Sequence, residues 1–156
     1  NALGYEFVDI DRAVERGSGM SVNEIFREGG EERFRSLEGE TLAAFARTPR
    51  LVISLGGGTL MEPKNFQTVT STGILIYLKT SADQILRRVS RRNDRPVLTD
   101  HTGERLTEEA LRARIDSLYR LREPVYARAD LTFATDDQRV GVTVDEIVRT
   151  LSRIIG

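Results

Sequence analysis

The chain contains no cysteine and a single histidine, and only two of its 23 cationic residues, Lys64 and Lys79, are lysines. Without cysteine there is neither a disulfide bond nor a thiolate metal site, and a reducing cytoplasm is the expected compartment. His101 lies in a polar stretch, so we expect a solvated side chain and not a general base. No apolar run reaches the roughly 18 residues of a bilayer span, so we expect no contact with a membrane.

The rest of the composition is typical of a globular protein. Hydrophobic residues make up 39% of the chain and charged residues 30%, and a net charge of -1 argues against nucleic-acid binding. With 156 residues we expect one domain, 1–156. Separately from the length, we also expect a monomer. Most cationic residues are arginines, which bind carboxylates and phosphates through two hydrogen bonds, although codon bias or surface ion pairs explain the same excess.

Four continuous apolar runs, each bounded by turn or charged residues, indicate short buried strands. We expect these strands at 5–8, 51–55, 73–78 and 131–134. Apolar residues at helical spacing lie between the strands, and we expect helices starting near Arg12 and at 22–26, 34–45, 82–92, 111–118 and 142–154. This alternation predicts an α/β fold of three layers, α/β/α, around a parallel sheet, with ligands beyond the carboxyl ends of the strands.

Two acids, Asp9 and Asp11, follow the first predicted strand. If both continue the strand, their side chains leave the same face at the edge where α/β folds bind ligands. They could hold Mg²⁺ through water and accept hydrogen bonds from a substrate hydroxyl. Alternatively, one of them caps the helix that starts near Arg12.

Three consecutive glycines, Gly56, Gly57 and Gly58, follow the second predicted strand. A run of glycines permits close approach of a ligand to the backbone, but it also occurs in ordinary turns. The run is not a Walker A loop, because no GxxxxGK[ST] sequence occurs in the chain.

Arg122 continues the helical stripe that contains Ile115 and Leu118, so we expect it to face inward. An inward guanidinium needs an anion, which either the protein or a ligand supplies. Glu123 points about 100° away on the helix, and we expect Pro124 to end the helix.

Other arginines have plain explanations. We expect Arg35 to form a surface ion pair with Glu38. A cluster at the end of a predicted helix complements the helix dipole and comprises Arg87, Arg88, Arg91, Arg92 and Arg95. Pro96 stiffens the chain after Arg95, which could aim that guanidinium at a phosphate. The stretch 95–106 lacks periodicity and is either a lid or a disordered connection.

The strings FVDID, GMSVNEIFREGGEERFRSLE, LGGGT, RRNDRPVL, LREPVYARAD and TDDQ occur in the order and spacing seen in shikimate kinases. The chain resembles that family over nearly all of its length. The resemblance implies a fold like that of the P-loop kinases. It also implies transfer of the ATP γ-phosphoryl group to the 3-hydroxyl of shikimate, with Mg²⁺, in the pathway to chorismate and the aromatic amino acids.

The resemblance also implies roles for residues that bind the substrate. In the DxD motif, the second acid binds substrate hydroxyls and is the proposed base, which corresponds to Asp11. Arg35 of FRxxE and Arg122 would bind the shikimate carboxylate, and Gly57 would offer its backbone N–H. Residues 11–45 would form the substrate-binding subregion.

On the nucleotide side, the resemblance implies that Asp9 assists Mg²⁺ binding and that Arg95 stabilises the transferring phosphoryl group. Arg88 would stack near adenine, Gln138 of TDDQ would lie beside the nucleotide, and residues 94–107 would form a lid that closes over the substrates.

The sequence departs from the family in one respect, because the family's P-loop and first central strand precede FVDID. We expect a further segment of roughly 25 residues before Asn1 to supply them. Three alternatives stay open: a non-catalytic fragment that binds a ligand, a regulatory or interaction module, and a related kinase acting on gluconate. The combination of Arg35, Arg122 and Asp11 favours shikimate.

Overall fold

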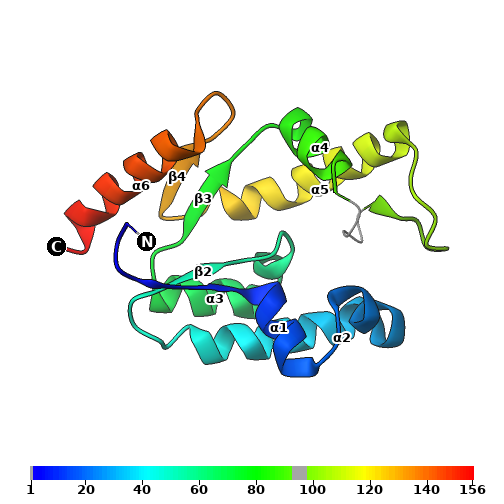
Figure 1. The fold of residues 1–156 in the computed structure, drawn as a ribbon, viewed down its shortest axis with the longest axis horizontal. Coiled ribbons are helices and arrows are strands. Elements are labelled where there is room, and N and C mark those ends of the chain that lie inside the picture. The colour runs from blue at the N-terminus through cyan, green and yellow to red at the C-terminus, as the bar shows by residue number, and fades with distance from the viewer. Residues whose placement is uncertain (1, 93–97) are drawn as a thin grey trace. The chain divides into compact units, whose positions relative to one another are not determined.

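The computed structural model describes residues 2–92 and 98–156 (Figure 1). The chain forms two compact units, Asn1–Leu75 and Ile76–Gly156. The first unit contains β1 (Glu6–Asp9), α1 (Ile10–Ser18), α2 (Val22–Phe45), β2 (Leu51–Ser54), the 3-10 helix η1 (Thr59–Met61) and α3 (Pro63–Thr72). The second unit contains β3 (Ile76–Lys79), α4 (Ala82–Ser90), α5 (Glu108–Tyr126), β4 (Leu131–Ala134) and α6 (Val140–Ile154).

The predicted strands all exist, and three of them match within one residue at each end. The third begins at residue 76 and not at 73, because residues 73–75 connect it to an unpredicted helix, α3, which ends at Thr72. The predicted helix at 22–26 also extends much further and joins the next predicted helix to form α2.

Helix α2 is capped at its start and kinked inside. The Ser21 hydroxyl accepts a hydrogen bond from the Glu24 backbone N–H at 3.1 Å, and the Glu24 carboxylate accepts one from the Ser21 N–H at 3.3 Å. Gly30 has φ 68° and ψ -173°, a conformation that is nearly exclusive to glycine and interrupts the helix. Residues on either side of Gly30 therefore form two helical segments.

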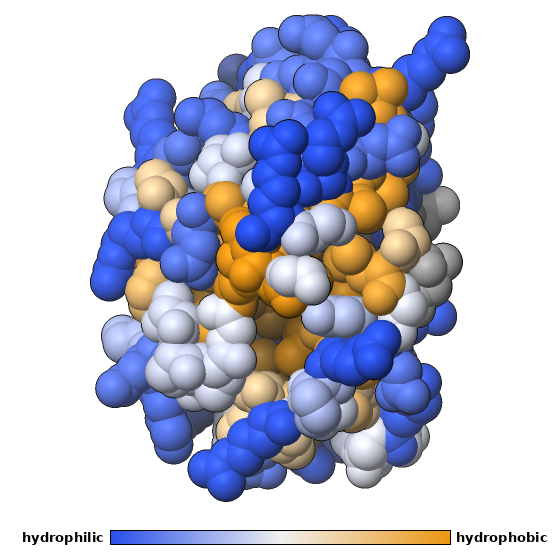
Figure 2. All heavy atoms as spheres, turned by 90° about the vertical axis from the view of Figure 1, so that its left-hand side faces the viewer, coloured by the Kyte–Doolittle hydropathy of each residue, from blue (hydrophilic) through white to orange (hydrophobic). Residues whose placement is uncertain are grey.

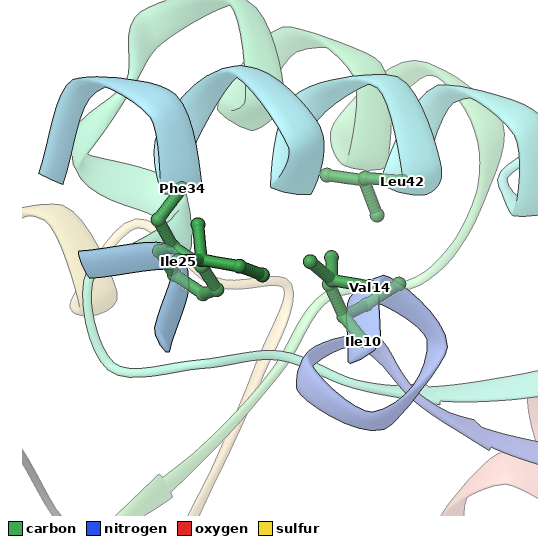
Figure 3. Packing of buried hydrophobic residues seen from close by; sticks show 5 residues of the cluster. All are labelled: Ile10, Val14, Ile25, Phe34 and Leu42. Carbon is green, nitrogen blue, oxygen red and sulfur yellow. The ribbon is translucent and has the colours of Figure 1, made fainter. Parts of the chain in front are cut away.

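In the first unit, β1 and β2 pair in parallel, with Val8 opposite Ile53. The core lies between α1 and α2, where Ile10 and Val14 pack against Ile25 and Leu42 (Figure 3). Each of these four side chains is almost completely buried, which fixes the start of α1 against α2.

In the second unit, β3 and β4 pair in parallel, with Ile76 opposite Leu131. A separate core joins α4 to α5 and contains Leu86, Leu98, Leu111 and Ile115. The expectation that Pro124 ends α5 is wrong, because the helix continues to Tyr126. Proline removes the hydrogen bond that the backbone N–H of residue 124 would make, but the backbone N–H of Ala127 still bonds to the Glu123 carbonyl and closes the last turn.

Apolar side chains also reach the surface. Figure 2 shows one face on which hydrophobic residues, in orange, are exposed between hydrophilic residues, in blue. In β1 and β2, the register partners Phe7 and Val52 are 68% and 44% exposed, whereas Val8 is buried. The strands therefore present apolar side chains on both faces, as the continuous apolar runs predict for a parallel sheet. Within the described residues, no helix has both the length and the apolar character of a membrane span.

Candidate active site

Asp9 and Asp11, the two acids of FVDID, have different structural roles. Asp9 ends β1 and caps α1, with its Oδ1 accepting a hydrogen bond from the Arg12 N–H at 3.1 Å. Asp11 lies in the first turn of α1 and is half-buried, with its Oδ1 shielded from solvent. The expectation that both side chains leave one face of a strand is wrong, because the chain enters the helix directly after Asp9 and the strand's alternation stops there. In the described parts of the chain, no three acidic or histidine side chains gather as a metal site.

The glycine run brings functional side chains close to the backbone. A Cβ atom at position 56 would lie 3.2 Å from Asp11 Oδ1, 3.3 Å from Thr59 Oγ1 and 3.4 Å from Glu38 Oε2. Three side-chain oxygens therefore converge on Gly56. At position 58 a Cβ atom would lie only 2.3 Å from Arg35 Nη2, so a glycine is required for the observed place of that guanidinium.

Arg35 and Glu38 form the predicted ion pair, but the pair is not on the surface. The Arg35 Nη1 atom donates to Glu38 Oε1 at 2.8 Å, and Glu38 is completely buried. The Arg35 guanidinium also contacts Glu31 at 3.3 Å, and its side chain remains 26% exposed. Burial lowers the pKa of Arg35, but the hydrogen bonds and charges of Glu38 and Glu31 outweigh it, so the net pKa is raised. The guanidinium is therefore charged and partly open to a ligand.

Two buried residues of this site were not predicted from the sequence. The Thr59 hydroxyl donates to Glu38 Oε2 at 2.8 Å, and the Asn65 amide donates to the Thr59 carbonyl oxygen at 3.0 Å. Thr59 is completely buried and Asn65 is 4% exposed. The sequence feature that could have identified Thr59 is its position directly after the glycine run. Together these bonds link η1 and α3 to the ion pair on α2.

In the second unit, Arg122 lies on α5 and is half-buried, which agrees with its expected inward position. Among the residues that the structure describes, no hydrogen bond or ion pair to Arg122 is formed. The neighbouring Glu123 is held on both oxygens, by the Tyr77 hydroxyl and by Lys79 Nζ at 3.4 Å. Burial, followed by the bond to Glu123, raises the pKa of Tyr77.

The residues expected beside the nucleotide also lie in the second unit. Arg88 is exposed in the last turn of α4, and Gln138 precedes α6, where its side-chain oxygen accepts a hydrogen bond from the Thr143 hydroxyl at 3.5 Å. Asp136 of TDDQ, which was not predicted, bonds to the Thr80 hydroxyl and to the Ser81 N–H at 3.0 Å. This aspartate therefore ties the ends of β3 and β4 together.

Arg95 and the first residues of the expected lid, 94–97, lie outside the described residues. The remaining part, 98–107, folds into a turn with an antiparallel bridge between Thr99 and Arg105. The Asp100 carboxylate organises this turn by accepting hydrogen bonds from the Thr102 hydroxyl and N–H, and these bonds lower the pKa of Asp100. Arg114 on α5 holds the base of the turn by donating to the Thr99 carbonyl oxygen at 2.6 Å.

Comparison with known proteins points to one family. The family model described as shikimate kinase matches residues 1–152. A shikimate kinase of Chlorobium chlorochromatii is 44% identical over 98% of this chain and 80% of its own length, and one of Chlorobaculum tepidum is 44% identical over 99% and 81%.

Solved structures give the same result. The shikimate kinase of Bacteroides thetaiotaomicron is 28% identical, with a TM-score of 0.82 over 98% of this chain and 85% of that protein. The enzyme of Acinetobacter baumannii, solved in complex with shikimate, is 27% identical, with a TM-score of 0.81 over 97% and 79%. These likenesses confirm the predicted α/β class with its parallel strands. On the sequence and structural evidence together, the chain belongs to the shikimate kinase family.

Proposed function

We propose that this chain catalyses the ATP-dependent phosphorylation of the shikimate 3-hydroxyl, giving shikimate 3-phosphate and ADP. The observation that carries the proposal is the convergence of the Asp11 carboxylate and the Arg35 guanidinium on the glycine run in a chain of this family. A carboxylate that accepts from hydroxyls and a charged arginine that binds a carboxylate match the two kinds of polar group on a hydroxy acid.

Asp11 is the proposed base and orients the hydroxyl that is phosphorylated. Its carboxylate is half-buried on the first turn of α1, where Asp9 caps the helix and Ile10 is fixed in the core. A rigid carboxylate holds a nucleophile in place for in-line transfer, and most of the catalysis of phosphoryl transfer is positioning and charge neutralisation.

The arginines are the proposed ligands of the shikimate carboxylate. Arg35 is charged and partly exposed, with Glu38 fixing one edge of its guanidinium. Arg122 is the second proposed ligand, supported by its half-buried position without a protein anion in the described part of its unit. Gly57, between Gly56 and Gly58, is exposed, and its backbone N–H is the proposed donor to the substrate.

On the nucleotide side, Arg88 and Gln138 are proposed to contact ATP, Arg95 to stabilise the transferring group, and residues 94–107 to act as a lid. Asp9 is the proposed Mg²⁺-assisting residue. Its Oδ1 caps α1, which leaves Oδ2 for a cation that is usually held by one or two carboxylates together with substrate phosphates. Bound Mg²⁺ would neutralise charge on the ATP phosphates. We further propose that the enzyme acts in the cytoplasm as a monomer.

The test is shikimate-dependent ADP release by the purified protein, with gluconate as the competing acceptor. Asp11→Asn should lower kcat at least about tenfold, because acid-base or orienting groups contribute that much or more. Asp137→Asn, at an exposed aspartate, is the matched control. Turnover of gluconate in preference to shikimate would contradict the substrate assignment, and near-normal kcat in Asp11→Asn would remove Asp11 from the chemistry.

A further inference from the structure

The ion pair between Arg35 and Glu38 depends on a third side chain. Glu38 is completely buried and has two carboxylate oxygens, each of which needs a hydrogen-bond donor because an unsatisfied buried carboxylate oxygen is costly. Oε1 accepts from Arg35 Nη1, and Oε2 accepts from the Thr59 hydroxyl, both at 2.8 Å. Thr59 lies 21 residues further along the chain, so this contact is set by the fold and not by the helix.

The Thr59 hydroxyl is itself held in place. Thr59 is completely buried, its backbone N–H donates to the Gly56 carbonyl at 3.2 Å, and its own carbonyl accepts from the Asn65 amide at 3.0 Å. Thr59 Oγ1 would also lie only 3.3 Å from a Cβ at position 56. A threonine fixed at its backbone on both sides offers its hydroxyl in one direction, toward Glu38.

We propose that Thr59 is a positioning residue for substrate recognition, because its hydroxyl occupies Glu38 Oε2 and leaves Oε1 to orient the Arg35 guanidinium. The effect on substrate passes through Arg35, and Asn65 supports it by holding the Thr59 backbone. The inference rests on the proposed function, in which Arg35 binds the carboxylate of shikimate.

Removal of the hydroxyl alone tests this inference. In Thr59→Val, Glu38 Oε2 loses its hydrogen-bond donor. The carboxylate then rotates toward another donor, and the Arg35 guanidinium loses its fixed orientation. We expect the KM for shikimate to rise about tenfold, the scale for a buried polar group left without its partner. The KM for ATP and kcat should stay unchanged, and Thr59→Ser should restore the KM for shikimate.

A double-mutant cycle separates positioning from general loosening of the fold. In the Arg35→Ala background, Thr59→Val should not raise the KM for shikimate further, because the guanidinium that Thr59 helps to orient is already absent. The control is Thr70→Val, which removes a hydroxyl from an exposed residue of α3 that donates to the Phe66 and Gln67 carbonyl oxygens of its own helix, and it should match the parent enzyme.

The outcomes distinguish the possible failures. An unchanged KM for shikimate in Thr59→Val, or additive effects with Arg35→Ala, would overturn the inference while leaving the proposed function intact. Absence of shikimate turnover in the parent enzyme would overturn the proposed function and, with it, this inference. If Thr59→Val does not fold, Thr59→Ala provides the same readout, and failure of both while Thr59→Ser folds would make the hydroxyl a requirement of folding and overturn the positioning role.

Discussion

The guanidinium of Arg35 occupies the space that a side chain at position 58 would need. A Cβ atom on residue 58 would lie 2.3 Å from Nη2 and 2.8 Å from Cζ of Arg35. The glycine at the end of the run therefore serves a protein side chain. This relationship explains why a glycine-rich turn and an arginine on a distant helix belong to one site.

Gly58→Ala should displace the Arg35 guanidinium without straining the backbone at residue 58. The alanine itself is compatible with the backbone, since φ at Gly58 is -103°, and the clashing atoms are the far end of a flexible side chain. We expect the KM for shikimate to rise about tenfold or more, because the bond between Arg35 and Glu38 is lost. Steady-state kinetics measures this, with Gly73→Ala as control because its nearest atom would be 3.9 Å away. A normal KM in Gly58→Ala would contradict the role of the observed guanidinium position.

Tyr77→Phe should destabilise the second unit. Its hydroxyl donates to Glu123 on the last turn of α5, and phenylalanine leaves that oxygen without its donor. We expect the free energy of unfolding to fall by about 1 kcal/mol. Lys79→Met removes the other partner of the same carboxylate, a pair at 3.4 Å whose lysine is exposed, and should change the free energy of unfolding by less than about 0.5 kcal/mol. Urea denaturation that ranks the two variants in the opposite order would contradict this prediction.

Asp136 should make the stability depend on pH in the acid range. Its bond to the Thr80 hydroxyl, and then the bond to the Ser81 N–H, lower its pKa in the folded protein. A lowered folded pKa gives a contribution that is present above the unfolded value of about 3.9 and is lost as the pH falls through the folded value. The stability difference between the parent and Asp136→Asn should therefore shrink below about pH 4. Thermal melting from pH 7 to pH 2 measures it, with Asp137→Asn as control, and a difference that grows on acidification would refute the assignment.

Gly30→Ala and Gly17→Ala should have opposite effects on stability. At neither position would a Cβ meet another atom within 4 Å, so only the backbone conformation differs. Gly30 has φ 68°, which alanine adopts only at a cost of about 1–3 kcal/mol. Gly17 lies within α1 without a positive φ, and alanine should stabilise it by about 0.4–1 kcal/mol. Denaturation curves of both variants provide the measurement, and an unchanged Gly30→Ala would contradict the strain argument.

Residue patterns predict the strands of this fold better than they predict which side chains become buried. Apolar runs locate all four strands, but α3 is missed because its ten residues contain only Phe66 and Val69 as large apolar side chains and several threonines. The spacing of Arg35 and Glu38 predicts their pairing. It does not predict their burial, since the covering residue, Thr59, comes from a distant part of the chain.

The DxD motif shows the same limit. A pattern of two acids separated by one residue indicates a shared strand face, but helix α1 begins at Ile10, two residues before the expected start near Arg12. Asp9 Oδ1 instead accepts a local hydrogen bond from the backbone N–H of Arg12, and this bond competes with ligand binding at that oxygen. The sequence is equally compatible with helix capping and with ligand binding by this acid. The roles of Asp11, Gly57, Arg88 and Gln138 come from the resemblance and stay predictions.

The direct passage from β1 into α1 limits how this segment can be engineered. The strand ends at Asp9 and the helix begins at Ile10, with no linker residue between them. One inserted residue within the first turn would rotate Asp11 by about 100° around the helix axis while the cap stays on Asp9. A mutant library at this junction should therefore vary side chains and keep the length constant, because spacing and not composition sets the direction of the carboxylate.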